Sequence, residues 1–274
     1  MPANPVGTPN MSQATAVEQS TDSSSRAMQL LRRHPLISFF VMAYAISWTY
    51  VIVFLIVWPL PDTIVTDTPE LLGRRFVMWR VSWAWYLYAL LAIPALYVIG
   101  VALVPGALGS FKAPSLTMSL LYPVFFIVVL VLDGPLLEEP GWRGFALPRL
   151  QARWGPLVGT VILGIMWGSW HAPQYFTKTF AAANGGLSVS GVIVFLLATV
   201  IFSVLITWAF NNTGGSLLIA ILIHTAINFT QALTSDLFPA AAYNEVVPVA
   251  VFGTAAVIVV IATRGRLGFK RATA

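Results

Sequence analysis

Long apolar stretches separated by short polar segments dominate the hydrophobic pattern of this chain. Each stretch is about 20 residues long, which is the length that an α-helix needs to cross a hydrocarbon core about 30 Å thick. The pattern therefore predicts an all-α fold, a polytopic transmembrane helical bundle with seven to eight spans. We expect membrane-spanning helices at residues 36–60, 81–104, 116–137, 156–176, 190–210, 216–233 and 247–263.

The uncertainty between seven and eight spans comes from the basic residues at the two ends of the bundle. Three arginines lie between residues 26 and 33, and four basic residues lie between 264 and 271. Lys and Arg beside spans favour the cytoplasmic side, so both ends are predicted to be cytoplasmic, which requires an even number of crossings. An eighth crossing before residue 137 would satisfy this requirement; the alternative is seven crossings with a first segment that inserts against the rule.

Composition excludes a soluble protein. The chain has 274 residues, of which 58% are hydrophobic and 9% are charged, with a mean hydropathy of +0.81; soluble domains carry roughly 25% charged residues. We expect a multi-pass integral membrane protein in contact with lipid, in the plasma membrane if the source is bacterial. The net charge of +5 then reflects topology and headgroup contact, and we expect no nucleic-acid partner. Because the chain has no cysteine, disulfides, iron–sulfur clusters and thiol nucleophiles are excluded.

The chain divides into four regions by composition. Residues 1–30 are polar and lack an apolar stretch, which predicts a disordered tail. N-terminal spans occupy 31–115, and the residues that could carry out chemistry lie in a core at 116–235. Residues 236–274 hold the last span and a basic C-terminal tail. Within the core, the span at 156–176 has glycines at 155, 159, 164 and 168, which form two Gly-x-x-x-Gly steps that allow close helix contact. We expect this span to lie inside the bundle.

The core contains polar residues that are costly at membrane depth. Glu138 and Glu139 stand side by side at the end of one apolar stretch, before an arginine-containing segment that we expect to be a loop. His171 and His224 lie in two other stretches, and Asn228 shares a helix face with His224 because it follows four residues later. Such groups within membrane segments usually face a protein interior or a water-filled cavity and serve a function.

Each of these residues also has a simpler explanation. A single buried histidine is more often a hydrogen-bonded packing residue than a ligand. His224 and Asn228 alone could form an interhelical hydrogen bond, which contributes about 1 kcal/mol in a membrane. Glu139 and Arg143 have the spacing of an ordinary i,i+4 ion pair. One shared site explains all of them together more economically.

The chemistry that this set supports is activation of water. A carboxylate can act as a general base toward water, and a histidine can orient the water or bind a metal. Two histidines and a glutamate are also a workable catalytic zinc set, and Asn228 could donate a hydrogen bond to a developing oxyanion. The chain lacks both a Gly-x-Ser-x-Gly elbow and a His-Glu-x-x-His helix. A serine nucleophile and a soluble-type metallopeptidase helix are therefore unsupported.

Three motifs make a family resemblance clear. Residues 138–143 (EEPGWR) resemble the Glu-Glu-x-x-x-Arg motif of the CPBP family, which comprises intramembrane CAAX-type prenyl endopeptidases and bacteriocin-processing or immunity proteins. Trp167-x-x-x-His171 resembles the second motif, in which the family normally has Phe where this chain has Trp. His224-x-x-x-Asn228 resembles the third. The motifs occur in the family's order over about 90 residues.

The resemblance implies an all-helical membrane endopeptidase of about eight crossings that cleaves membrane-associated peptides or protein tails. Carried over by position, Glu138 is the water-activating base and His171 assists it. His224 and Asn228 support the oxyanion.

Glu139 and Arg143 have supporting roles in this assignment, in which they orient or balance the site. The resemblance leaves a metal-dependent alternative open. One divalent metal, zinc above all, would then be held by Glu138, His171 and His224, and Glu139 would become the more natural base.

Two functions of other classes also fit the sequence. The buried carboxylates and histidines could form the relay of a proton-coupled carrier, although the chain shows no internal repeat of the kind that carriers use. The protein could also be a non-catalytic immunity or scaffold protein that binds a partner.

Overall fold

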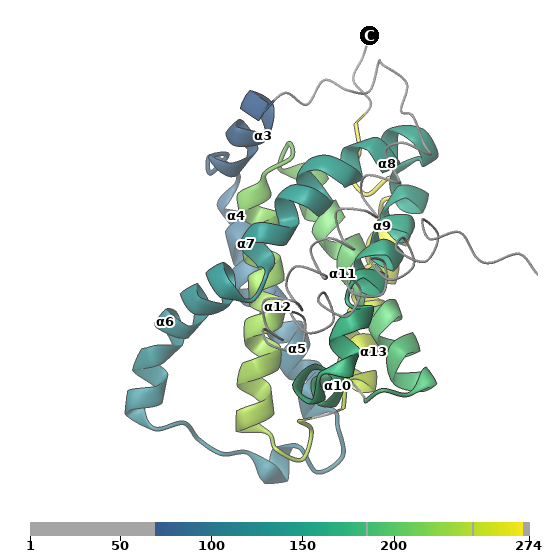
Figure 1. Cartoon of the computed structure of the whole chain (residues 1–274). Coiled ribbons are helices and arrows are strands. Elements are labelled where there is room, and N and C mark those ends of the chain that lie inside the picture. Colours follow the sequence, from purple (N-terminus) through teal and green to yellow (C-terminus); the bar gives the residue numbers. More distant parts are fainter. Residues whose placement is uncertain (1–68, 185, 243, 271–274) are drawn as a thin grey trace, which may run out of the picture. The chain divides into compact units, whose positions relative to one another are not determined.

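The computed structural model describes residues 69–270 except 185 and 243, and every regular element among them is a helix (Figure 1). All contacts discussed below lie within this part of the chain. The predicted span at 36–60 falls outside it, so the total of seven to eight crossings remains a prediction. The helices are α3 Pro69–Phe76, α4 Trp83–Leu87, η2 Tyr88–Ala92, α5 Ile93–Ala102, η3 Leu108–Ser110, α6 Leu116–Leu132, α7 Pro135–Glu139, η4 Pro140–Ala146, α8 Leu147–Trp154, α9 Pro156–Trp170, η5 Ala172–Phe176, α10 Lys178–Ala183, α11 Val189–Asn212, α12 Leu217–Leu237 and α13 Val246–Ala262.

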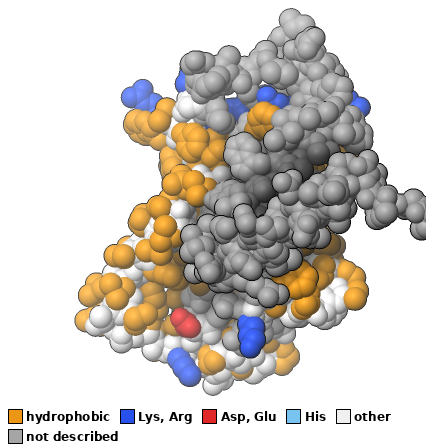
Figure 2. All heavy atoms as spheres, in the orientation of Figure 1, with side chains coloured by type: hydrophobic (Ala, Val, Ile, Leu, Met, Phe, Trp, Pro, Cys, Tyr) orange, Lys and Arg blue, Asp and Glu red, His pale blue; other side chains and the backbone are white. Residues whose placement is uncertain are grey.

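Several of these helices are long and apolar enough to cross a bilayer, which confirms a multi-pass integral membrane protein. Four such stretches occur among the described residues, and α13 is a shorter apolar helix. The four stretches are Trp83–Ala102, Leu116–Trp154, Val189–Asn212 and Leu217–Leu237. Figure 2 shows hydrophobic side chains spread over α6, whose leucines, valines and phenylalanines are largely exposed, as expected for a helix that faces lipid.

Helix α12 is the most buried of the candidate spans and packs against α5, α6, α7 and α11. Its long buried face includes the predicted site residue His224. A helix in this position can present polar side chains to several neighbours at once, away from lipid. This placement brings His224 and Asn228 into the interior half of the bundle.

Helix α9 lies against α8 and α11 as closely as its glycines allow. A methyl group added at Gly164 would lie 2.5 Å from the Cα of Val200, and one added at Gly159 would lie 2.7 Å from the backbone carbon of Leu150. Larger residues at these positions would therefore force the helices apart. The prediction of an interior helix with close glycine contacts is confirmed.

The segment that carries the glutamates differs from the predicted uninterrupted span followed by a loop. Helix α6 ends at Leu132, and α7 begins only at Pro135, because Gly134 has a φ of 103° that no regular helix adopts. After α7 the chain continues through the π-helical turn η4 into α8, so residues 138–154 are helical. Pro140 has no N–H to bond to the preceding turn, and a widened π turn accommodates such a break without ending the helix.

Candidate active site

A buried ion-pair network forms the base of the site. The Oε1 atom of Glu139 accepts hydrogen bonds from Arg143 Nη1 at 2.7 Å and from His224 Nδ1 at 2.8 Å. Glu139 and Arg143 are 0% exposed, and Arg143 Nη2 also donates to Ser203 Oγ of α11 at 3.1 Å. The predicted i,i+4 contact is therefore present, and it ties α7, η4, α11 and α12 together through charged hydrogen bonds.

This network sets the tautomer of His224. The carboxylate oxygen of Glu139 is an acceptor, so Nδ1 of His224 must carry the proton in their 2.8 Å contact. Nε2 is then the ring nitrogen available to other partners. Glu139 thereby also fixes the orientation of the His224 ring.

Glu138 has a different environment from its neighbour. It is partly buried, and its Oε2 accepts a hydrogen bond from the indole Nε1 of Trp167 at 2.8 Å. A side chain at Gly134 would displace Glu138 Oε1, and the φ of 103° at this position disfavours any residue other than glycine. Adjacent residues on a helix point about 100° apart, and this rotation separates the buried Glu139 from the more accessible Glu138.

His171 caps the C-terminus of α9 with its Nδ1 committed to the backbone. Nδ1 lies 2.8 Å from the carbonyl oxygen of Trp167, which only accepts, so Nδ1 is protonated and Nε2 is free. Phe180 stacks on the ring at 5.8 Å, and Phe195 meets it edge-on at 5.3 Å. In both predicted histidines, Nδ1 therefore donates its proton to another acceptor, and Nε2 is the ring nitrogen that remains available.

Trp167 is the central residue of the site. Besides its hydrogen bond to Glu138, its ring lies 4.9 Å from the His224 ring and 6.0 Å from the His171 ring. The guanidinium of Arg143 lies 4.6 Å from the centre of its ring, a cation–π distance. The aromatic residue of the second motif thus contacts four of the six predicted site residues.

Asn228 joins the site through a residue that sequence reasoning missed. Its Nδ2 donates to Asp133 Oδ2 at 3.1 Å and, over a longer distance of 3.5 Å, to the backbone carbonyl oxygen of Asp133. Asp133 lies in the break between α6 and α7. The signal for it was present in the sequence, since Asp133 is a third carboxylate in the apolar stretch that ends with the glutamates.

Comparison with known proteins matches this part of the chain to a family. Residues 120–230, which include all three motifs, match the family described as type II CAAX prenyl endopeptidase Rce1-like. Residues 120–230 are thus similar to the Rce1-like family. CAAX prenyl protease 2 of Methanococcus maripaludis is 31% identical over 118 residues. That alignment covers 42% of this chain and 42% of the relative.

The matched segment does not gather the three predicted zinc ligands into a metal site. Across residues 69–270, apart from the two gaps, no group of three His, Asp or Glu side chains is placed to hold a metal ion. Each histidine uses Nδ1 for another acceptor, which leaves Nε2 as its available ligand atom, but the two Nε2 atoms and Glu138 do not converge on one position. As placed, Glu138, His171 and His224 therefore do not fit the predicted ligand set, and no step below is routed through a metal.

Proposed function

We propose that this protein is an intramembrane endopeptidase, in a bundle of seven to eight crossings, that hydrolyses a peptide bond with water activated by Glu138. The observation that carries the proposal is the different environment of the two adjacent glutamates. Glu139 is fully engaged in a buried ion-pair network, whereas Glu138 is partly exposed and has one oxygen without a protein hydrogen bond. A carboxylate of the second kind can accept a proton from water.

The side chains around Glu138 support a two-step hydrolysis. Glu138 takes one proton from water, while His171 Nε2 accepts a hydrogen bond from the remaining O–H, which stays on the oxygen and orients it. The water oxygen attacks the scissile carbonyl carbon, and the carbon–nitrogen bond breaks as Glu138 passes its proton to the leaving amine. A general base of this kind contributes roughly 10²–10⁴-fold to the rate.

The developing oxyanion needs hydrogen-bond donors. Asn228 directs one N–H to the Asp133 carboxylate and the other to the Asp133 carbonyl oxygen at 3.5 Å, and this longer, weaker contact can give way so that the N–H donates to the oxyanion. His224 Nε2 can donate only when the ring is doubly protonated, and Glu139, hydrogen-bonded to Nδ1, stabilises that charged form. In this proposal Glu139 and Arg143 position His224 and take no proton from water.

The substrate is a membrane-associated peptide or protein tail. The name of the Methanococcus relative makes a prenylated CAAX tail the first substrate to test. Purified protein in liposomes should cleave such a fluorogenic tail, with product identified by mass spectrometry. Transport of a solute across the same liposomes without any cleavage would favour a carrier instead.

We expect the Trp167→Phe variant to cleave about 10- to 100-fold more slowly than the wild type, because a hydrogen bond to a charged group contributes roughly 1.5–3 kcal/mol. The change removes the indole N–H that orients Glu138 but keeps an aromatic ring beside His224. Steady-state kinetics should show the loss in kcat, with KM little changed. Trp170→Phe, which alters the neighbouring indole packed edge-on against His171, is the matched control. An equal loss in both variants would contradict a specific role for Trp167.

We expect cleavage to persist after the protein has been dialysed against a strong chelator, because the three predicted ligands do not form a metal site. Elemental analysis of the purified protein should find zinc far below one atom per chain. Loss of activity on chelation, with recovery on adding zinc back, would contradict the mechanism above and make Glu139 the better candidate for the base.

A further inference from the structure

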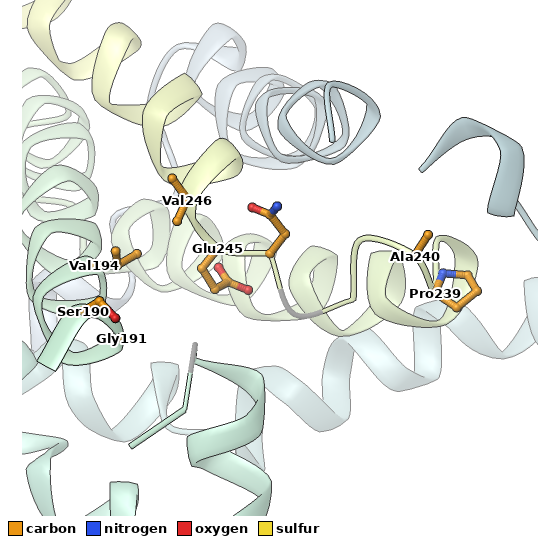
Figure 3. A pocket seen from close by; sticks show the side chains of 8 residues that line it. Ser190, Gly191, Val194, Pro239, Ala240, Glu245 and Val246 are labelled. Carbon is orange, nitrogen blue, oxygen red and sulfur yellow. The ribbon is translucent and has the colours of Figure 1, made fainter. Parts of the chain in front are cut away.

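A second carboxylate site lies at the other end of the polar face of α12. Ser190, Gly191 and Val194 of α11 and Asn244, Glu245 and Val246 before and in α13 line a cavity of about 410 Å³ (Figure 3). This volume is within the range of small-molecule and side-chain pockets. The Glu245 side chain points into the space between these elements (Figure 3). None of these residues belongs to the three motifs.

Neutral groups alone hold the Glu245 carboxylate. Gln231 Nε2 donates to Oε1 at 3.0 Å, and the Tyr97 hydroxyl lies 3.3 Å from Oε1 and 3.2 Å from Oε2. No described Lys, Arg or His forms an ion pair with it, whereas Glu139 in the main site has two such partners. A carboxylate that is largely buried and lacks a cationic partner is costly, and a cation in the adjacent cavity would offset that cost.

Burial raises the pKa of the Glu245 carboxyl above its ordinary value, and the hydrogen bonds from Gln231 and Tyr97 counteract part of this rise. Both donors are well placed to hold the ionised form. Tyr97 is only 3% exposed, so it cannot turn away to solvent. The two hydrogen bonds therefore oppose the effect of burial on the Glu245 pKa without cancelling it.

Helix α12 connects this pocket to the proposed catalytic residues. His224, Asn228 and Gln231 have the i, i+4, i+7 spacing of one helix face. At 1.5 Å per residue, Gln231 lies about 10 Å along the axis from His224. An extended peptide covers that distance in about three residues.

An aromatic cluster connects the wall of the Glu245 pocket to the surroundings of His171. The Tyr175 hydroxyl lies within hydrogen-bond distance of the carbonyl oxygen of Gly191, which lines the pocket. Its ring packs against Phe180 and Phe195, and both of these rings contact His171. The wall of the pocket and the surroundings of His171 are therefore parts of one packed unit.

We propose that the Glu245 pocket is a substrate subsite that binds a basic side chain, Lys or Arg, about three residues from the scissile bond. The proposal rests on the proposed peptidase function and adds a specificity determinant to it. Glu245 pairs with the cationic end of the side chain, while Val194 and Val246 contact its aliphatic stem. The subsite takes no part in the chemical step.

The test uses pairs of lipid-anchored fluorogenic peptides, one with lysine and the other with norleucine at the same position. Successive pairs move this position by one residue along the peptide. At the matching position, wild-type protein should cleave the lysine peptide with a kcat/KM about tenfold higher than the norleucine peptide, mainly through KM. Glu245→Gln should abolish this preference and leave cleavage of the norleucine peptide unchanged. Asp236→Asn, which removes an exposed carboxylate at the end of α12, should keep the preference.

Equal slowing of both peptides by Glu245→Gln, or no lysine preference at any position, would overturn the subsite while leaving the peptidase function intact. Affinities of the same peptides, measured by fluorescence anisotropy, separate the two proposals. If no peptide is cleaved, tighter binding of the lysine peptide to wild type than to Glu245→Gln still supports the pocket. Equal affinities overturn it.

Discussion

Replacing Glu138 by alanine is expected to reduce peptide cleavage by about 10²–10⁴-fold, to the limit of detection in most assays. The variant loses the group that removes the proton from water. It should still fold, because Glu138 is partly buried and bonds only to Trp167, outside the network of Glu139, Arg143 and His224. Cleavage in liposomes and the thermal unfolding midpoint of the same preparation measure the two effects separately.

Two matched variants sharpen this experiment. Glu138→Gln keeps the size of the side chain and an oxygen for Trp167 but cannot accept the proton, so it should be as inactive as the alanine variant. Leu137→Ala changes the preceding residue, whose side chain is 69% exposed, and should retain wild-type activity. Full activity of Glu138→Gln would refute the base assignment. A wild-type biological phenotype in both Glu138 variants would indicate the non-catalytic scaffold.

Arg143→Ala is expected to destabilise the protein by about 3–5 kcal/mol, the usual cost of removing one partner of a buried ion pair. Arg143 is 0% exposed, and its loss leaves the Glu139 carboxylate buried with His224 as its remaining partner. Ser203 and the face of Trp167 lose a contact at the same time. Denaturant titration in detergent, followed by intrinsic tryptophan fluorescence, measures the free energy of unfolding.

The control is Arg153→Ala, which removes an exposed arginine from the adjoining helix α8. Surface substitutions of this kind usually change stability by about 0.5 kcal/mol or less. The double variant Glu139→Gln/Arg143→Met should cost less than the sum of the single changes, because it leaves no buried charge unpaired. Equal costs for Arg143→Ala and Arg153→Ala would show that the network contributes little to folding.

Much of this architecture follows from the sequence because a bilayer restricts what a chain can do. Segments that span lipid must satisfy their own backbone hydrogen bonds, so apolar stretches of about 20 residues become helices. Residues 81–104, 190–210 and 216–233 coincide closely with helical stretches of the structure. Residues that the motifs singled out also lie together, since Glu139, Arg143 and His224 are in direct contact and Trp167 contacts Glu138.

The detail around the glutamates was not predictable in the same way. Hydropathy alone does not reveal the break at Gly134, which depends on one backbone conformation with positive φ. That break places Asp133 beside Asn228, a contact between residues 95 positions apart. Likewise, the sequence predicts a loop after the glutamates, but a π turn and helix α8 keep this segment helical.

The sequence by itself determined that this is a multi-pass membrane protein and that two carboxylates, two histidines, an asparagine and an arginine lie in its core segments. Only the tertiary structure decided which glutamate is sealed inside and which is accessible. Glu138 and Glu139 have the same chemistry, but they point about 100° apart on the helix. Helices α11 and α12 pack on the Glu139 side, where His224 of α12 contacts Glu139 and Ser203 of α11 contacts its ion-pair partner Arg143. That division depends on which neighbours surround the helix, a fact that no local pattern of residues contains.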